Sequence, residues 1–325
     1  MSSYLDYGNA KDDNCLKSMF GRDSDSSDDE AAIDVTVEAN IPHEMKEITK
    51  FPSNICKTDI TIETSRVRGI AHQLWPASFL LCKYLEDNYS TYFSSPSSTS
   101  VVELGAGVGL GGLLCGMFGC RSVMVTDLPE AMELIDRNIH LNGHLFPHPD
   151  NIRSAVLRWG EMEDCVSCMT ALGAGGGESG HEGDALGGCS VPGHQEQTSL
   201  LVIAADCVYW EHLYAPLFET LLYFTSRGAT VVLSHTKRWK REKKFFSMCA
   251  RRMAVEVVYE AVQLLPEEEE EEAPFSPPPE VAERVTAGME TSGLESSSQG
   301  QRRVRRQVSR VYVLRGGRDK GAKSS

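Results

Sequence analysis

A glycine-rich run directly after an apolar segment constrains the fold of this chain more than any other feature. Residues 101–104 form a short apolar run typical of a buried strand, and glycines follow at positions 105, 107, 109, 111 and 112. Glycine permits a tight turn and lets backbone N–H groups approach a ligand at the start of a helix. The run therefore predicts a strand, a ligand-binding turn and a helix, in that order.

Apolar strand-like runs alternate with helical patterns on both sides of this turn. Short continuous apolar strands separated by helices indicate an α/β fold, a parallel sheet with helices on both faces. Two further runs, 255–259 and 308–314, have no clear helix between them and predict a terminal antiparallel pair. The expected strands cover 60–62, 101–104, 122–126, 155–157, 200–205 and 229–233, and the expected helices 75–85, 110–118, 129–141, 213–224 and 241–252.

Low-complexity segments flank and interrupt this pattern. Residues 1–50 contain an acidic run and little apolar periodicity, which predicts a disordered tail. The glycine-rich segment 161–199 and the acidic, proline-rich segment 266–303 predict loops inserted into a fixed core. We therefore expect one folded domain, formed by residues 51–265 plus 304–316 and followed by a basic tail at 317–325.

Composition limits where the chain works and what it binds. A formal net charge of −14 argues against non-specific nucleic-acid binding, and no apolar run reaches the roughly 20 residues of a membrane helix. The ten cysteines lie mostly in apolar runs, where a reduced thiol behaves as a small hydrophobic group. We expect an intracellular monomer in the cytoplasm, and the basic clusters at 237–244 and 302–306 leave the nucleus open.

An acid after the next strand-like run indicates what the glycine turn binds. Asp127 directly follows the run 122–126 and is placed to accept hydrogen bonds from ribose hydroxyls. With the glycine turn, it predicts an adenosine-containing cofactor. A dinucleotide-dependent dehydrogenase and a purely structural turn stay open at this point, because Gly107-x-Gly-x-x-Gly112 alone is a weak signal.

The acid before the first glycine narrows the choice. Glu103-x-Gly105-x-Gly107-x-Gly109 resembles motif I of the class I, seven-β-strand S-adenosylmethionine methyltransferases, whose Rossmann-like sheet ends in an antiparallel strand. The resemblance implies S-adenosylmethionine as cofactor and Asp127 as the acid that holds its ribose. The cofactor-binding residues that it implies around the turn are Glu103, Gly105, Ala106, Gly107, Gly109, Asp127 and Leu128.

A second motif follows the fourth strand of the expected core. Asp206-x-x-Tyr209 resembles the motif at this place in the family-sixteen protein-lysine methyltransferases, of the methyltransferase-like 21 type. The tryptophans of Leu74-Trp75-Pro and Arg158-Trp159-Gly resemble this group's cofactor-contacting residues, and Ala205 joins them at the end of the strand. The implied function is methylation of a lysine on another protein. Histidine, a small molecule or nucleic acid as acceptor, and a non-catalytic adapter, stay open.

The two acceptor residues have a predicted role in positioning. Asp206 and Tyr209 are expected to hold the acceptor amine, and Asp206 is not expected to promote its deprotonation, since a nearby carboxylate raises the pKa of a lysine. The basic run 237–244 is interpreted as a solvated helix face, and its functional alternative is contact with an acidic substrate surface. The resemblance implies a chaperone or translation-type factor as partner.

One cysteine group has spacings that a zinc site could use. Cys165-x-x-Cys168, Cys189 and His194 fit no strict zinc-finger template, and their flanks have low complexity. The sequence therefore predicts no bound metal.

Overall fold

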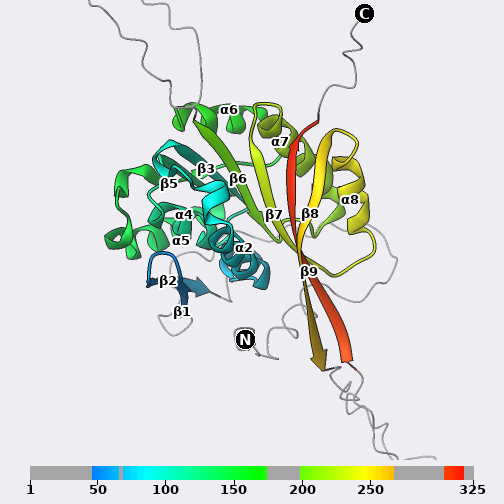
Figure 1. Ribbon diagram of the computed structural model, residues 1–325, viewed down its shortest axis with the longest axis horizontal. Helices are drawn as coiled ribbons and strands as arrows, with labels where there is room; N and C mark the ends of the chain where they lie inside the picture. The colour runs from blue at the N-terminus through cyan, green and yellow to red at the C-terminus, as the bar shows by residue number, and fades with distance from the viewer. Residues whose placement is uncertain (1–45, 66–68, 174–197, 267–303, 318–325) are drawn as a thin grey trace, which may run out of the picture. The chain divides into compact units, whose positions relative to one another are not determined.

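A computed structural model of the chain describes residues 46–65, 69–173, 198–266 and 304–317 (Figure 1). Within these residues a seven-stranded sheet forms the centre of the folded part, in the order β5-β4-β3-β6-β7-β9-β8. Its strands are β3 (Thr99–Leu104), β4 (Ser122–Asp127), β5 (Ile152–Val156), β6 (Ser199–Ala205), β7 (Thr230–Lys237), β8 (Met253–Pro266) and β9 (Val304–Gly316).

The sheet is mostly parallel and ends in antiparallel strands. β3 pairs in parallel with β4 and with β6, so that Val102 lies opposite both Met124 and Val202. β9 enters between β7 and β8 and is antiparallel to both. The expected α/β class and terminal antiparallel pair are confirmed, and β8 and β9 are longer than the runs 255–259 and 308–314 that predicted them.

Helices cover both faces of this sheet (Figure 1). One face packs against α2 (Pro76–Asp87), α4 (Leu110–Met117) and α5 (Pro129–Leu141), and the other against α6 (Met162–Ala171), α7 (Tyr214–Thr225) and α8 (Glu242–Cys249). Short helices join them: α3 (Tyr89–Tyr92), η3 (Ile70–His72), η4 (Pro96–Ser98), η5 (Gly143–Leu145), η6 (Pro149–Asn151) and η7 (Glu211–Leu213).

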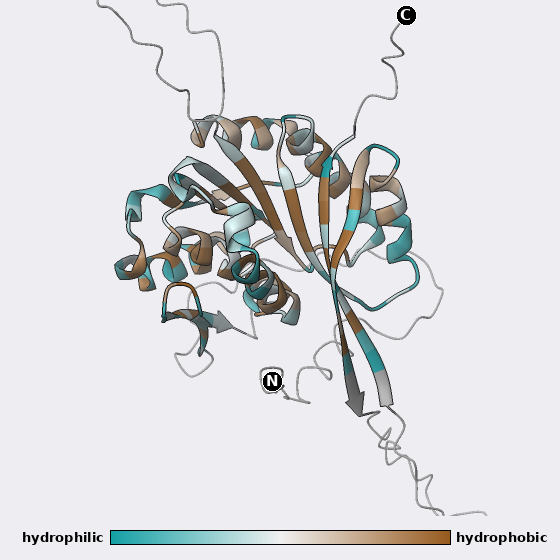
Figure 2. Cartoon of the chain, viewed as in Figure 1, coloured by the Kyte–Doolittle hydropathy of each residue, from teal (hydrophilic) through white to brown (hydrophobic). Residues whose placement is uncertain are grey.

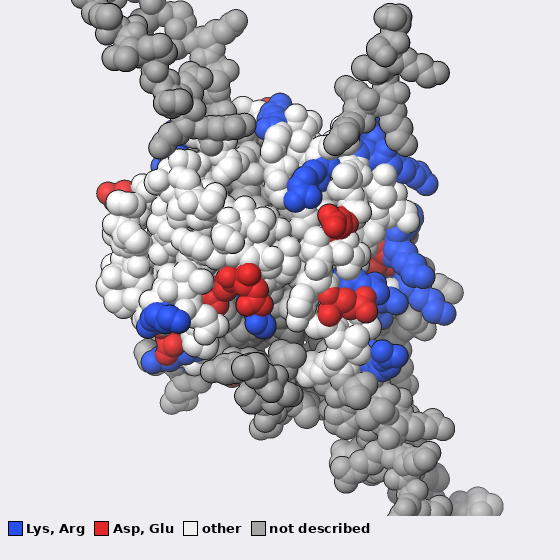
Figure 3. Space-filling model, in the orientation of Figure 1, with Lys and Arg blue, Asp and Glu red and all other residues white. Residues whose placement is uncertain are grey.

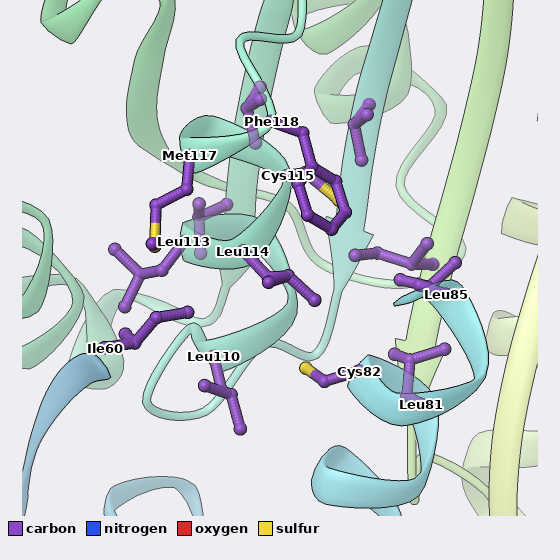
Figure 4. Packing of buried hydrophobic residues seen from close by; sticks show 14 of the residues in the cluster. Ile60, Leu81, Cys82, Leu85, Leu110, Leu113, Leu114, Cys115, Met117 and Phe118 are labelled. Carbon is purple, nitrogen blue, oxygen red and sulfur yellow. The ribbon is translucent and has the colours of Figure 1, made fainter. Parts of the chain in front are cut away.

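The side-chain period of a strand explains why these strands read as continuous apolar runs. In β3 every residue is buried, and Val101 belongs to the core on one face while Val102 belongs to the core on the other. Hydropathy colouring shows the apolar strands at the centre of the sheet (Figure 2). On the first face, α4 directs Leu110, Leu113 and Leu114 toward this core (Figure 4).

A two-stranded sheet precedes this domain and corrects the predicted tail. β1 (Lys46–Ser53) pairs with β2 (Thr58–Ser65), so residues 46–50, expected to be disordered, form a strand. β1 buries only Phe51 and Ser53, which is too little apolar periodicity to reveal a strand. Order comes from its partner β2, whose Thr61 and Glu63 are hydrogen-bonded to the buried side chains of Asn142, which follows α5, and Asn138 on α5.

The expected insertion at 161–199 is also corrected at both ends. Residues 162–171 form α6, and residue 199 already belongs to β6. The helix was missed because cysteine and methionine, with Leu172, make most of its buried face, at Cys165, Cys168 and Met169. Residues 1–45, 174–197, 267–303 and 318–325, with the remaining predicted tails and insertions, lie outside the described part of the chain.

The structure places half of the cysteine group in the core. Cys165 and Cys168 are free thiols packed with α7, and Cys189 and His194 lie outside the described residues. Among the residues that the structure describes, no three His, Cys, Asp or Glu side chains are grouped as a metal site. Within the same residues no helix is long and apolar enough to cross a membrane.

Candidate functional site

The carboxyl ends of β3, β4 and β6 bring most of the predicted site residues together. The glycine turn after β3 is hydrogen-bonded to the end of β4, with Ala106 N–H donating to the Thr126 carbonyl over 3.0 Å. It also contacts the segment after β6, where the Cys207 thiol lies 3.3 Å from the Leu104 carbonyl. This edge is where open α/β sheets bind their ligands.

The glycine turn has a backbone shape that other residues adopt poorly. Gly105 and Gly107 both have φ of 57°, and Gly109, which precedes α4, has φ of 84°. A β-carbon at Gly105 would lie 2.7 Å from the Trp159 ring, and one at Gly107 would lie 3.1 Å from the Ala71 carbonyl oxygen. The turn is thus held closely by Trp159 on one side and by the η3 segment on the other.

Glu103 lies beneath this turn. Its two carboxylate oxygens accept hydrogen bonds from the backbone N–H groups of Gly111 and Gly112, over 3.1 and 2.8 Å. Burial raises the pKa of Glu103 to about 8, although these two hydrogen bonds act in the opposite direction. Both oxygens support the first turn of α4, whose N–H groups have no partner within the helix. Direct contact of Glu103 with a cofactor stays a prediction.

Asp127 faces the glycine turn from the end of β4. Its oxygens accept hydrogen bonds from the Gly107 and Leu128 N–H groups, each over 2.7 Å. Burial raises the pKa of Asp127, and these two bonds oppose that rise. A carboxylate has about four acceptor positions, so each oxygen keeps one for a ribose hydroxyl. Leu128, 47% exposed, offers an apolar surface beside it.

The two predicted tryptophans lie at different sides of the site. Trp159 is half-buried, and its ring lies against Gly105. Trp75 precedes α2, and its indole N–H donates to the Ile70 carbonyl over 3.0 Å. The guanidinium carbon of Arg238 lies 5.7 Å from the centroid of the Trp75 ring. Trp75 is therefore connected to the segment after β7.

Asp206 has an unusual backbone and a strong partner. It follows Ala205, the last residue of β6, and its φ of 59° lies in the left-handed region that non-glycine residues rarely adopt. Arg238 donates to its two carboxylate oxygens over 2.8 and 2.6 Å. Burial would raise the pKa of Asp206, but the charge and hydrogen bonds of Arg238, with those of His235, hold it well below its usual range.

The interpretation of the basic run as a solvated helix face is wrong for Arg238. Its side chain is only 11% exposed, whereas Lys237 and Lys240 in the same run are exposed. Lys237, expected on a helix face, ends β7 instead. An arginine usually lies at the surface, so its inward direction depends on the buried acid after β6, a partner distant in sequence.

Two further residues that the sequence did not reveal complete this cluster. His235 is buried, with Nδ1 3.5 Å from Asp206 and Nε2 3.0 Å from Glu242. Glu242 accepts hydrogen bonds from the backbone N–H groups of Arg238 and Trp239, over 3.0 and 3.1 Å. Burial acts to lower the pKa of His235, but the two carboxylates outweigh it and raise the pKa. The one feature of the sequence that could have indicated this cluster is Glu242, an acid within the basic run 237–244.

Tyr209 lies half-buried one short loop after Asp206. Burial raises the pKa of its phenol well above the usual range, so the group is a neutral hydroxyl at neutral pH. Its ring packs edge-on against Trp210, with 5.1 Å between the centroids. The structure thus places a neutral phenol near a neutralised acid.

Several known proteins are similar to this chain. A family profile described as lysine methyltransferase matches residues 55–171 and 191–252, more than half of the chain. The Danio rerio "Protein N-lysine methyltransferase METTL21A" is 27% identical over 213 residues, 62% of this chain and 80% of that protein. The Saccharomyces cerevisiae "Protein-lysine N-methyltransferase EFM6" is 28% identical over 201 residues, 58% and 72% of the two chains.

One further relative and one solved structure are also similar to this chain. The Mus musculus "EEF1A lysine methyltransferase 3" is 29% identical over 170 residues, which cover 52% of this chain and 57% of that protein. Magnesium protoporphyrin IX methyltransferase from Synechocystis, solved with the cofactor bound, has a TM-score of 0.35 and 10% identity, and covers 77% of this chain and 88% of its own. From the profile match, the chain belongs to the family of S-adenosylmethionine-dependent lysine methyltransferases.

Proposed function

We propose that this chain transfers a methyl group from S-adenosylmethionine to a lysine side chain of another protein, at the edge of the sheet where β3, β4 and β6 end. Support comes from the family and from one observation above all. The glycine turn with Asp127, which fits the cofactor, lies beside the segment of Asp206 and Tyr209, which fits the acceptor. The two halves of a transfer reaction are thus adjacent.

The residues present fit the cofactor. Asp127 has free acceptor positions for ribose hydroxyls, and the glycine turn brings backbone N–H groups to the start of α4. Trp75 and Trp159 add aromatic surface. S-adenosylmethionine supplies a methyl group already activated by the positive sulfur, so the protein contributes mainly alignment and exclusion of water.

On the acceptor side, Asp206 and Tyr209 would position the amine. Transfer to nitrogen is an in-line displacement that needs an uncharged amine and close alignment more than a strong base. A neutral Tyr209 hydroxyl can donate or accept one hydrogen bond without charging the site. Asp206 fixes the end of β6 through its backbone bond to the Ser234 carbonyl, over 2.8 Å.

We propose a substrate protein with an acidic surface near the acceptor. Lys237, Lys240, Arg241 and Lys243 are exposed between the end of β7 and α8, close in sequence to Arg238. Figure 3 shows Lys and Arg side chains gathered on the side of the molecule where α8 lies in Figure 1. One relative is named for methylation of EEF1A, which favours a translation-type factor as partner.

Two variants separate the cofactor half from the acceptor half. Asp127→Ala removes the ribose acceptor and should weaken binding of labelled S-adenosylmethionine at least tenfold, because one charge-assisted hydrogen bond contributes about 1.5–3 kcal/mol. Asp206→Ala should bind the cofactor within about threefold of wild type but lose methylation of protein in cell extract. Normal methylation by Asp206→Ala would contradict the acceptor assignment, and unchanged binding by Asp127→Ala the cofactor assignment.

A further inference from the structure

The acid at the acceptor end is already paired with a cation of the same chain. Arg238 donates from two nitrogens to the two oxygens of Asp206 and also to the Thr236 carbonyl, over 3.1 Å. The exposed fractions of the Arg238 and Asp206 side chains are 11% and 5%. A bidentate pair so little exposed is screened far less than a surface ion pair, so each charge strongly affects its surroundings.

The pair is also held in place from behind. Glu242, the first residue of α8, accepts hydrogen bonds from the backbone of Arg238 and Trp239. His235 lies between Glu242 and Asp206, at 3.0 and 3.5 Å. Arg238 is therefore fixed at its backbone and at its guanidinium group. Its position beside Asp206 is a built feature of the β7–α8 link rather than one rotamer of a surface side chain.

Arg238 connects the two halves of the site. Its guanidinium carbon lies 5.7 Å from the ring centroid of Trp75, a predicted cofactor residue, while its nitrogens bind Asp206, a predicted acceptor residue. From the sequence, Arg238 is expected only as part of the basic run 237–244.

Charged and titratable groups face this pair from each neighbouring element. A protonated His235 would balance Glu242, as Arg238 balances Asp206, so the four side chains would carry no net charge. Cys207 and Tyr209 after β6 interact electrostatically with Asp206 and with Asp127 on β4. Arg310 on β9 lies opposite His235 in the sheet and pairs with Glu260 on β8.

A free carboxylate would work against methyl transfer. An acceptor lysine must present the lone pair of an uncharged amine, and an unpaired acid beside it raises the pKa of its ammonium group. We propose that Arg238 neutralises Asp206 so that the acceptor lysine loses its proton in the site. This inference rests on the proposed function. The amine lone pair then forms the N–C bond as the S–C bond breaks, sulfur keeps that electron pair, and the methylated nitrogen releases its extra proton to solvent.

The pH profile of methylation tests this role. Arg238→Gln leaves Asp206 charged and unpaired, so the rising limb of the profile should move up by about one pH unit, which is roughly tenfold slower transfer below the amine pKa. Arg238→Lys keeps the charge, and its limb should stay within a few tenths of a pH unit even if transfer is slower. Asp206→Asn keeps Arg238 and removes the acid, so its limb should move to lower pH.

The measurement uses the full chain, saturating labelled S-adenosylmethionine, and dialysed cell extract at a concentration where the labelling rate at a mapped lysine no longer rises with added extract. Under these conditions the initial rate is proportional to kcat, whose pH profile reports the pKa of the amine bound in the site. Asp206→Asn with Arg238→Gln removes both charges and should restore the wild-type limb, which also covers the case in which Arg238→Gln alone fails to fold. If these variants lower the rate equally at every pH, the role of Arg238 is structural and the inference is wrong. If wild type labels no lysine, the proposed function itself fails.

Discussion

At the scale of single residues, some buried side chains depend on one or two specific neighbours, so that one substitution can test the pairing. Glu103 is an acid buried under a helix start, and it tolerates that position because Gly111 and Gly112 direct N–H groups at it. The same two glycines leave room for the carboxylate, since a β-carbon at Gly111 would lie 2.6 Å from one of its oxygens. The acid and the two glycines therefore form one unit of the turn.

Gly112→Ala should lower the free energy of unfolding by about 1–3 kcal/mol. Its β-carbon would lie 2.5 Å from Val125 Cγ2 and 2.9 Å from Glu103 Oε2, and Val125 is fully buried. Gly143→Ala is the matched control, because nothing lies within 4 Å of its β-carbon position. Denaturant unfolding of both variants measures the difference. Equal stability of the two would show that the space around Glu103 is not restricted.

The turn could be predicted from the spacing of its glycines, because glycine adopts positive φ angles far more easily than other residues. Gly105 and Gly107, singled out from the sequence, both have positive φ. The same reasoning could not find Arg238, His235 and Glu242. Arg238 and His235 are buried beside Asp206, about 30 residues away, and Glu242 is buried beside His235. The local sequence predicts where the backbone must adopt a conformation that favours glycine. A buried charge cluster depends on tertiary contacts, which the local sequence does not show.

At the scale of elements, the link between β7 and α8 depends on one buried imidazole. His235 ends up between the carboxylates of Asp206 and Glu242, which fixes the turn that carries Arg238. Two acids meeting in a buried space need a compensating positive charge. The free energy of unfolding should therefore depend on the protonation of His235.

His235→Gln should flatten the pH dependence of stability. The folded-state pKa of His235 is raised above its ordinary value of 6.5, so its protonation stabilises the fold fully below pH 6.5. That stabilisation is lost as the pH rises through the folded-state pKa. The free energy of unfolding, measured at several pH values on either side of 6.5, should fall with rising pH for wild type and fall less for the variant. His148→Gln, at an exposed site, should follow wild type.

The strands of the central sheet could be predicted, whereas β1 and α6 could not. β3, β4, β6 and β7 each contain a continuous apolar run because both faces of the sheet are covered. β1 buries two side chains and is ordered by β2, so its own sequence carries no pattern. An amphipathic or continuous apolar run predicts a helix or strand from its own sequence. A strand that is ordered mainly by pairing with its neighbour shows no such run.

At the scale of the whole molecule, charge is divided unevenly. The chain carries a net charge of −14, yet exposed basic residues occupy the segment after β7 that leads into α8. Opposite charges on two partners increase their rate of encounter and select the partner. An acidic substrate surface would therefore be guided to the end of the sheet where Arg238 and Asp206 lie.

The central claim is methyl transfer to a protein lysine, and mass-spectrometric mapping tests it most directly. Wild type, incubated with labelled S-adenosylmethionine and dialysed cell extract, should place the label on a lysine of a protein. Asp127→Ala, with its weakened cofactor binding, should lower that labelling at least tenfold at limiting cofactor. Label on histidine, arginine or nucleic acid, with none on lysine, would contradict the account.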